Sequence, residues 1–143
     1  MGERFAIVAG RFNEPVVARL VDGAVSYFDR ESIGFDLTWV PGAFELPLTA
    51  KVVAETGRYA AVVCLGAVIR GETSHYDLVA GEAARGIMDV GLSTSLPVVF
   101  GVVTTETVDQ AMDRAGGEHG NKGWDAAAAA AAMARVVKEV RGV

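Results

Sequence analysis

Four short runs of apolar residues, rich in Val, Ile and Phe, recur along the chain, and each is followed by a longer segment with apolar residues at helical spacing. This alternation is typical of a parallel sheet whose strands are connected by helices. Because the runs are almost continuously apolar, we expect the strands to be buried on both faces. The pattern therefore predicts a three-layer α/β/α fold around a four-stranded parallel sheet. The expected strands are residues 4–9, 35–40, 60–69 and 97–104.

Helix start and stop signals follow the first two predicted strands. One helix begins after Asn13, a favoured N-cap residue, carries Pro15 in its first turn and runs to about residue 30. The next spans about residues 45–56 and ends at Gly57, which we expect to act as its C-cap. With helices on both faces of a parallel sheet, the topology expected is flavodoxin-like.

Three further helices are predicted in the second half of the chain. One opens at Ser74, and its partner Asp77 approximates a capping box. A short helix with the same signal at residues 107–110 ends at a pair of glycines, and a last helix follows Asn121. The last helix contains seven consecutive alanines, residues 126–132, whose small side chains allow close approach of either the sheet or another subunit.

Composition and charge narrow the class of protein. With 143 residues, of which 51% are hydrophobic, the chain fits one domain with a substantial core, and we expect a single domain over residues 1–143. The net charge of −5 argues against binding nucleic acid. No apolar run approaches the roughly 20 residues of a membrane span, and no signal peptide precedes the first strand, so we expect a cytoplasmic protein without a membrane partner.

Cysteine and histidine are scarce. Cys64 is the single cysteine and lies inside an apolar run, so we interpret it as a small buried hydrophobic residue. No pair of histidine and carboxylate residues has the spacing typical of metal ligands, and we expect no metal site.

Candidate ligand-binding residues follow the predicted strands, where open parallel sheets bind ligands. Phe12 and Phe44 either stack on a flat ligand or cover the core as hydrophobic lids. Glu45 either complements the dipole of its helix or bonds sugar hydroxyls. His75 lies where a helix dipole disfavours the imidazolium form, and it is either a proton acceptor or a capping residue. Arg114 either stabilises a helix end or binds phosphate, so these residues alone indicate a small phosphorylated or planar ligand.

Five motifs, in order and spanning nearly the whole chain, resemble those of lumazine synthases. They are GRFN at 10–13, VPGAFE at 40–45, GAVIRGETSHYD at 66–77, FGVVTT at 100–105 and GNKG at 120–123. The resemblance implies a transferase of riboflavin biosynthesis that needs no cofactor. It would condense 5-amino-6-(D-ribitylamino)uracil with 3,4-dihydroxy-2-butanone 4-phosphate, giving 6,7-dimethyl-8-ribityllumazine, phosphate and water in the penultimate step.

The resemblance also implies roles for individual residues. His75 would be the catalytic proton shuttle, Phe12 would stack on the pyrimidine, and Glu45 would bond ribityl hydroxyls. Arg114 would neutralise the phosphate, and Phe100 would reach the site from the adjacent subunit. The implied substrate-binding residues are Phe12, Asn13, Ala43, Phe44, Glu45, Ala67, Val68, Ile69, Glu72, Thr73, Phe100, Arg114 and Lys122.

Assembly is a further implication of the resemblance, which predicts a homopentamer with sites shared between adjacent subunits. The chain lacks the N-terminal extension with which many lumazine synthases add a strand to a neighbour, yet its turn at 116–123 lacks the insertion seen in members that stop at pentamers. The sequence therefore does not decide between a pentamer and an icosahedral capsid that encloses riboflavin synthase as a partner. The alternatives are a non-catalytic riboflavin- or lumazine-binding protein, a cage protein of the same fold, and a doubly wound domain that holds a phosphorylated cofactor.

Overall fold

The computed structural model of the chain describes residues 3–72 and 75–143, and for Glu72 it describes the backbone alone. The strands of the main sheet are β1 (Arg4–Gly10), β2 (Gly34–Val40), β3 (Val62–Ile69) and β4 (Val98–Thr105). The α-helices are α1 (Glu14–Arg30), α2 (Leu46–Glu55), α3 (Tyr76–Thr94), α4 (Val108–Asp113) and α5 (Lys122–Arg141). Short elements complete the chain: the 3-10 helices η1 (Ala43–Glu45) and η2 (Arg70–Glu72), and the strands β5 (Ala115–Gly117) and β6 (Gly120–Asn121).

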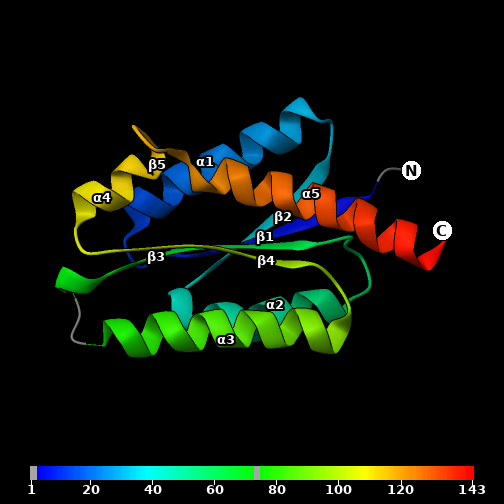
Figure 1. Cartoon of the computed structure of the whole chain (residues 1–143), viewed down its shortest axis with the longest axis horizontal. Helices are drawn as coiled ribbons and strands as arrows, with labels where there is room; N and C mark the ends of the chain where they lie inside the picture. The colour runs from blue at the N-terminus through cyan, green and yellow to red at the C-terminus, as the bar shows by residue number, and fades with distance from the viewer. Residues whose placement is uncertain (1–2, 73–74) are drawn as a thin grey trace.

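The four long strands form one parallel sheet in the order β2-β1-β3-β4. Helices α1, α4 and α5 cover one face of the sheet, and α2 and α3 cover the other (Figure 1). The predicted three-layer fold is therefore confirmed, and the strand order follows the flavodoxin-like arrangement. Within the described residues, no helix combines the length and apolarity needed to cross a membrane.

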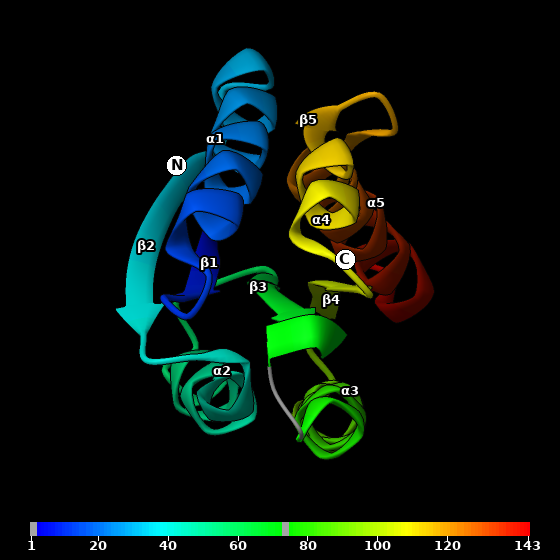
Figure 2. The same ribbon diagram turned by 90° about the vertical axis from the view of Figure 1, so that its left-hand side faces the viewer.

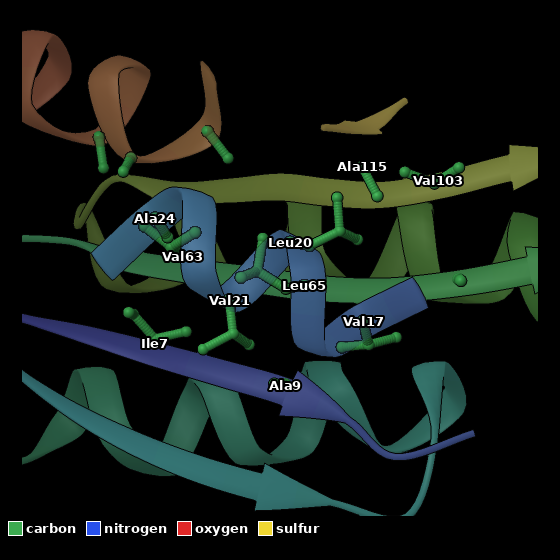
Figure 3. Close-up of a cluster of buried hydrophobic side chains, with 14 of the residues drawn as sticks. Ile7, Ala9, Val17, Leu20, Val21, Ala24, Val63, Leu65, Val103 and Ala115 are labelled. Atoms are coloured by element: carbon green, nitrogen blue, oxygen red, sulfur yellow. The ribbon is translucent and has the colours of Figure 1, made fainter. Parts of the chain in front are cut away.

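The core consists of two apolar clusters, one on each face of the sheet. Phe28 of α1 is fully buried and contacts Phe5 and Phe35, with ring centroids 5.4 and 5.8 Å apart. Figure 3 shows the side chains of α1 packed between the strands and the start of β5. Strand β3 is buried along its whole length, as its continuous apolarity predicts.

The alanine run of α5 packs inside the protomer. Ala126, Ala127, Ala130 and Ala131 are buried in the cluster shared with α1 and the sheet, whereas Ala129 and Ala132 are exposed. The start of α5 approaches α1 still more closely, because the carbonyl of Leu20 lies where a Cβ of residue 123 would stand. Of the two neighbours that the sequence allowed, the sheet with its covering helix α1 is the one observed.

Asn121 joins the start of α5 to α1. Its side-chain oxygen accepts hydrogen bonds from the N–H groups of Gly123 and Trp124, at 2.8 and 3.1 Å, and thereby caps α5 as its position predicted. Its side-chain amide donates to the carbonyl of Arg19, 3.0 Å away. One residue therefore begins a helix and attaches it to another.

The expected end of the short helix α4 is wrong. Its capping box, between Thr107 and Gln110, is present, but the helix ends at Asp113 rather than at the glycine pair. The chain then forms the two-stranded hairpin of β5 and β6. Gly116 and Gly120 have φ values of 103° and 78°, which only glycine adopts readily, so the glycines serve the hairpin.

An ion pair and a hydroxyl hold β2 at the edge of the sheet. The Arg4 guanidinium bonds the carboxylate of Asp36, with a shortest distance of 2.6 Å, and the Tyr59 hydroxyl donates to the same carboxylate at 2.7 Å. The hydrogen bonds from Arg4 and Tyr59 hold the pKa of Asp36 below its usual value. The contacts connect β1, β2 and the segment before β3.

Cys64 lies fully buried in β3, and burial raises the pKa of its thiol to about 12. We expect the native thiol to resist a disulfide reagent at pH 8, whereas denaturant exposes it to rapid labelling. Because the unfolded thiol titrates near the ordinary value of 9.0, stability should fall as the pH rises from there towards about 12. Urea unfolding across this range, compared with Cys64→Ala to remove the contribution of other groups, measures the effect. Rapid labelling of native protein would contradict this prediction.

Candidate functional site

A cavity of about 350 Å³ opens beyond the carboxyl ends of β1 and β3, the edge that faces the viewer in Figure 2. We call it the aromatic pocket. It is lined by Phe12, Pro41, Gly42, Ala43, Phe44, Glu45, Ala67, Val68, Ile69 and Val79. The structure therefore brings together residues predicted after the first and second strands with the end of the third strand itself, at the edge where ligands of open parallel sheets bind.

Phe12 and Phe44 are the aromatic side chains of this pocket. They are 59% and 55% exposed, and neither belongs to a core cluster. Of the two roles that the sequence allowed, covering the core as lids is therefore not what they do here. Two accessible rings beside an apolar wall suit a flat ligand.

The loops that carry the two rings are joined through their backbones. The N–H groups of Arg11 and Phe12 donate to the carbonyls of Val40 and Pro41, at 2.8 and 3.0 Å. The loops pack so closely that a Cβ on Gly10 would lie 2.8 Å from the carbonyl carbon of Gly42. A glycine at position 10 is therefore required for this approach.

Asn13 differs from its predicted role. It occupies the N-cap position of α1, but its side chain does not cap the helix. Instead, its side-chain amide donates to the carbonyl of Ala67, 3.1 Å away. The backbone of Asn13 is left-handed, with φ 63° and ψ 42°, and departs from the extended conformation from which N-cap side chains usually bond.

Glu45 ends η1 and directly precedes α2. Its side chain is exposed and lines the aromatic pocket, while its carbonyl accepts a hydrogen bond of 3.0 Å from the Thr49 hydroxyl. The carboxylate therefore stands both at a helix N-terminus, where negative charge is favourable, and at the pocket, where it can accept hydrogen bonds from hydroxyls.

His75 directly precedes α3 and is exposed. Its carbonyl accepts the N–H of Val79 at 2.9 Å, and among the described residues its side chain caps none of the first-turn N–H groups. Thr73, an implied substrate-binding residue, and Ser74, the expected start of the helix, lie outside the described residues, as does the side chain of Glu72. Val79 also lines the pocket, a role that sequence reasoning missed; its position one turn after His75 was the available signal.

Arg70 anchors the connection from β3 to α3, a role that sequence reasoning missed. Its guanidinium pairs with Asp77 at 3.3 Å and with Glu106 at 3.2 Å, and it lies 4.6 Å from the centre of the Tyr76 ring. The N–H of Gly71 donates to the carbonyl of Glu106 at 3.3 Å. These contacts hold both ends of the connection against the segment that follows β4.

The remaining predicted residues gather in a second cavity, of about 400 Å³, beside the edge strand β4 and the start of α5. We call it the edge groove. Phe100, Arg114 and Lys122 line it, and Phe100 is 41% exposed. Arg114 is also the C-cap residue of α4, where its positive charge interacts favourably with the helix dipole, as one of the two interpretations of the sequence expected. Among the described residues, neither Arg114 nor Lys122 forms an ion pair with a carboxylate.

The aromatic pocket and the edge groove are separate, since no described residue lines both. The aromatic pocket offers aromatic and apolar surface with a single carboxylate, whereas the edge groove offers two cations, a phenyl ring and the carboxylate of Asp125. A ligand that is both planar and phosphorylated would need both surfaces.

A comparison with protein families agrees with this picture. A family model described as 6,7-dimethyl-8-ribityllumazine synthase matches residues 2–138. The match covers both cavities, the complete parallel sheet and nearly all of α5. The chain therefore belongs to the 6,7-dimethyl-8-ribityllumazine synthase family, the transferases of riboflavin biosynthesis.

Proposed function

We propose that this protein condenses 5-amino-6-(D-ribitylamino)uracil with 3,4-dihydroxy-2-butanone 4-phosphate to give 6,7-dimethyl-8-ribityllumazine, phosphate and water. The observation that carries the proposal is the aromatic pocket, in which two exposed phenyl rings face the apolar end of β3 and one carboxylate. A pyrimidine stacks on such rings, and a ribityl chain donates hydroxyl hydrogen bonds to a carboxylate such as that of Glu45.

The separation of the two cavities supports a site shared between copies of the chain. In a ring of more than two copies, one surface patch of each copy contacts a different patch of the next. A homopentamer in which the edge groove of one copy faces the aromatic pocket of its neighbour would bring Arg114, Lys122 and Phe100 to the pyrimidine site. Exposed apolar side chains on the outer surface of α2 and α3 favour such self-association. They are Leu48, Val52, Leu78, Met88 and Leu92.

The chemistry proposed uses few groups. The primary amine of the uracil condenses with the ketone to an imine and releases water. Elimination of phosphate leaves an enol that tautomerises to a second carbonyl, and the ribityl-bearing nitrogen attacks this carbonyl and releases a second water as the ring closes. His75, at the N-terminus of α3, transfers protons in these steps, and Arg114 of the adjacent copy neutralises the phosphate. Glu72 and Thr73 are proposed to hold the phosphate at the start of α3. Holding two reactants in contact supplies much of the acceleration, because it removes the entropic cost of their encounter.

To test the proposal, purified protein is mixed with both substrates, and formation of the fluorescent lumazine is measured over time. We expect a rate that saturates with each substrate and exceeds the uncatalysed background. His75→Ala should lower kcat by about 10²- to 10⁴-fold without abolishing turnover, because reactant positioning remains. His119→Ala removes the only other histidine, from the exposed hairpin, and serves as the comparison variant. Because His119 lines a cavity with Arg114, its rate should fall, but less than that of His75→Ala.

Two outcomes would contradict the proposal. A folded, oligomeric wild-type protein with no rate above background would indicate a non-catalytic protein that binds lumazine or riboflavin. Complete loss of turnover in a folded His75→Ala oligomer would contradict the claim that positioning of the reactants accelerates the reaction without proton transfer by His75.

A further inference from the structure

Strand β3 extends beyond the end of β1. Their pairing covers only Ala6–Ala9 with Val62–Leu65, whereas β3 continues to pair with β4 as far as Ile69. The carbonyl of Ala61 accepts the N–H of Ala6 at 3.0 Å, and successive residues of a strand direct their backbone groups to alternate sides. The carbonyl of Ala67 therefore faces β1 beyond the last pair of residues.

The carbonyl of Ala67 needs a donor at this point. Ala67 is only 3% exposed, and an unpaired buried carbonyl is unfavourable. The side-chain amide of Asn13 supplies the hydrogen bond at 3.1 Å and so takes the place of a strand partner. Asparagine suits the position for a second reason, because it is among the few residues other than glycine that tolerate the left-handed backbone observed there.

The neighbour of Asn13 in the chain is Phe12, which lines the aromatic pocket. The N–H of Phe12 is bonded to the carbonyl of Pro41 on one wall of the pocket, and the amide of Asn13 is bonded to Ala67 on the other wall. These two bonds attach the segment that carries the Phe12 ring to both walls of the pocket.

We propose that Asn13 is a positioning residue, which replaces a β1–β3 strand hydrogen bond with a side-chain bond and thereby holds Phe12 across the open end of the sheet. The effect on substrate rests on the proposed function, whereas the effect on the loop does not. The role goes beyond a direct contact with substrate, because it operates in the ligand-free protein.

Two variants distinguish the contribution of the Asn13 side-chain amide from that of its left-handed backbone. Asn13→Gly keeps access to the left-handed backbone and removes the amide, and Asn13→Asp keeps the shape and removes the donor. In ligand-free protein, we expect hydrogen exchange of the Phe12 N–H, which bonds Pro41, to rise by about tenfold or more in both variants. Ser32→Gly is the matched control, because Ser32 also has a positive φ, of 57°, but lies in the loop before β2. It should leave exchange at Phe12 unchanged.

Steady-state kinetics then test the consequence for the site. We expect the KM for the ribitylaminouracil to rise by about tenfold in Asn13→Gly, while the KM for the phosphate substrate changes less than about twofold. Unchanged exchange at Phe12 in both Asn13 variants would overturn the positioning role. Increased exchange with an unchanged KM for the uracil would overturn its link to substrate. If the wild-type protein shows no synthase activity, the exchange measurement still decides the structural part, so the two proposals fail separately.

Discussion

Replacing Gly123 with alanine is expected to destabilise the folded protein by about 3 kcal/mol, because the new methyl group has no room between α5 and α1. The backbone carbonyl of Leu20 occupies the position of the Cβ, and backbone cannot move aside as a flexible side chain can. The helices would have to separate, and the bonds of Asn121 to Arg19 and to the first turn of α5 would weaken. Urea unfolding followed by circular dichroism, at one fixed protein concentration, measures the change.

Gly81→Ala is the matched control, since Gly81 is an exposed helical glycine in α3 and no neighbouring group lies within 4 Å of the position that a Cβ would take. Alanine has the higher helix propensity, so this variant should gain about 0.5 to 1 kcal/mol. An unfolding midpoint for Gly123→Ala equal to that of the wild type would show that α1 and α5 separate without cost, and would contradict the prediction.

Mixed oligomers of Phe12→Ala and Arg114→Ala chains are expected to recover activity that each variant alone has lost. Phe12 lines the aromatic pocket and Arg114 the edge groove. Loss of stacking or of a charge-assisted bond should each lower kcat/KM by about ten- to a hundredfold. If each site combines the pocket of one chain with the groove of the next, random mixing of equal amounts leaves about one site in four with both residues intact. The two variants are refolded together, mixing is verified by mass spectrometry, and lumazine formation is measured.

A second mixture is the matched control for this experiment. Phe12 and Phe44 line the same pocket of the same chain, so every site formed from Phe12→Ala and Phe44→Ala chains contains one damaged pocket. This mixture should show no recovery. Equal activity in the two mixtures, with mixing verified, would mean that the pocket and the groove do not belong to one shared site.

The sequence alone determined the layers of the fold. The strands appear as apolar runs, although the edge strand β2 is buried only at Val40. The helices appear as segments with caps such as the Thr107–Gln110 pair and Asn121. These signals are local, because a cap or a period involves residues within a few positions of one another. The place of the aromatic pocket could be predicted for the same reason: most of its residues follow or end parallel strands, whose carboxyl ends lie at one edge.

Only the tertiary structure decided which candidate residues lie together and which lie in separate cavities. Asn13 has the local signature of a helix cap, yet its amide bonds Ala67, 54 positions away, because β3 extends beyond the end of β1. Arg70 contacts Glu106, and the glycines after α4 form a hairpin rather than a helix end. The separation of Phe12 from Arg114 likewise depends on the path of the whole chain. Contacts between distant residues depend on where strands pair and part, and no local pattern of hydrophobic and polar residues contains that information.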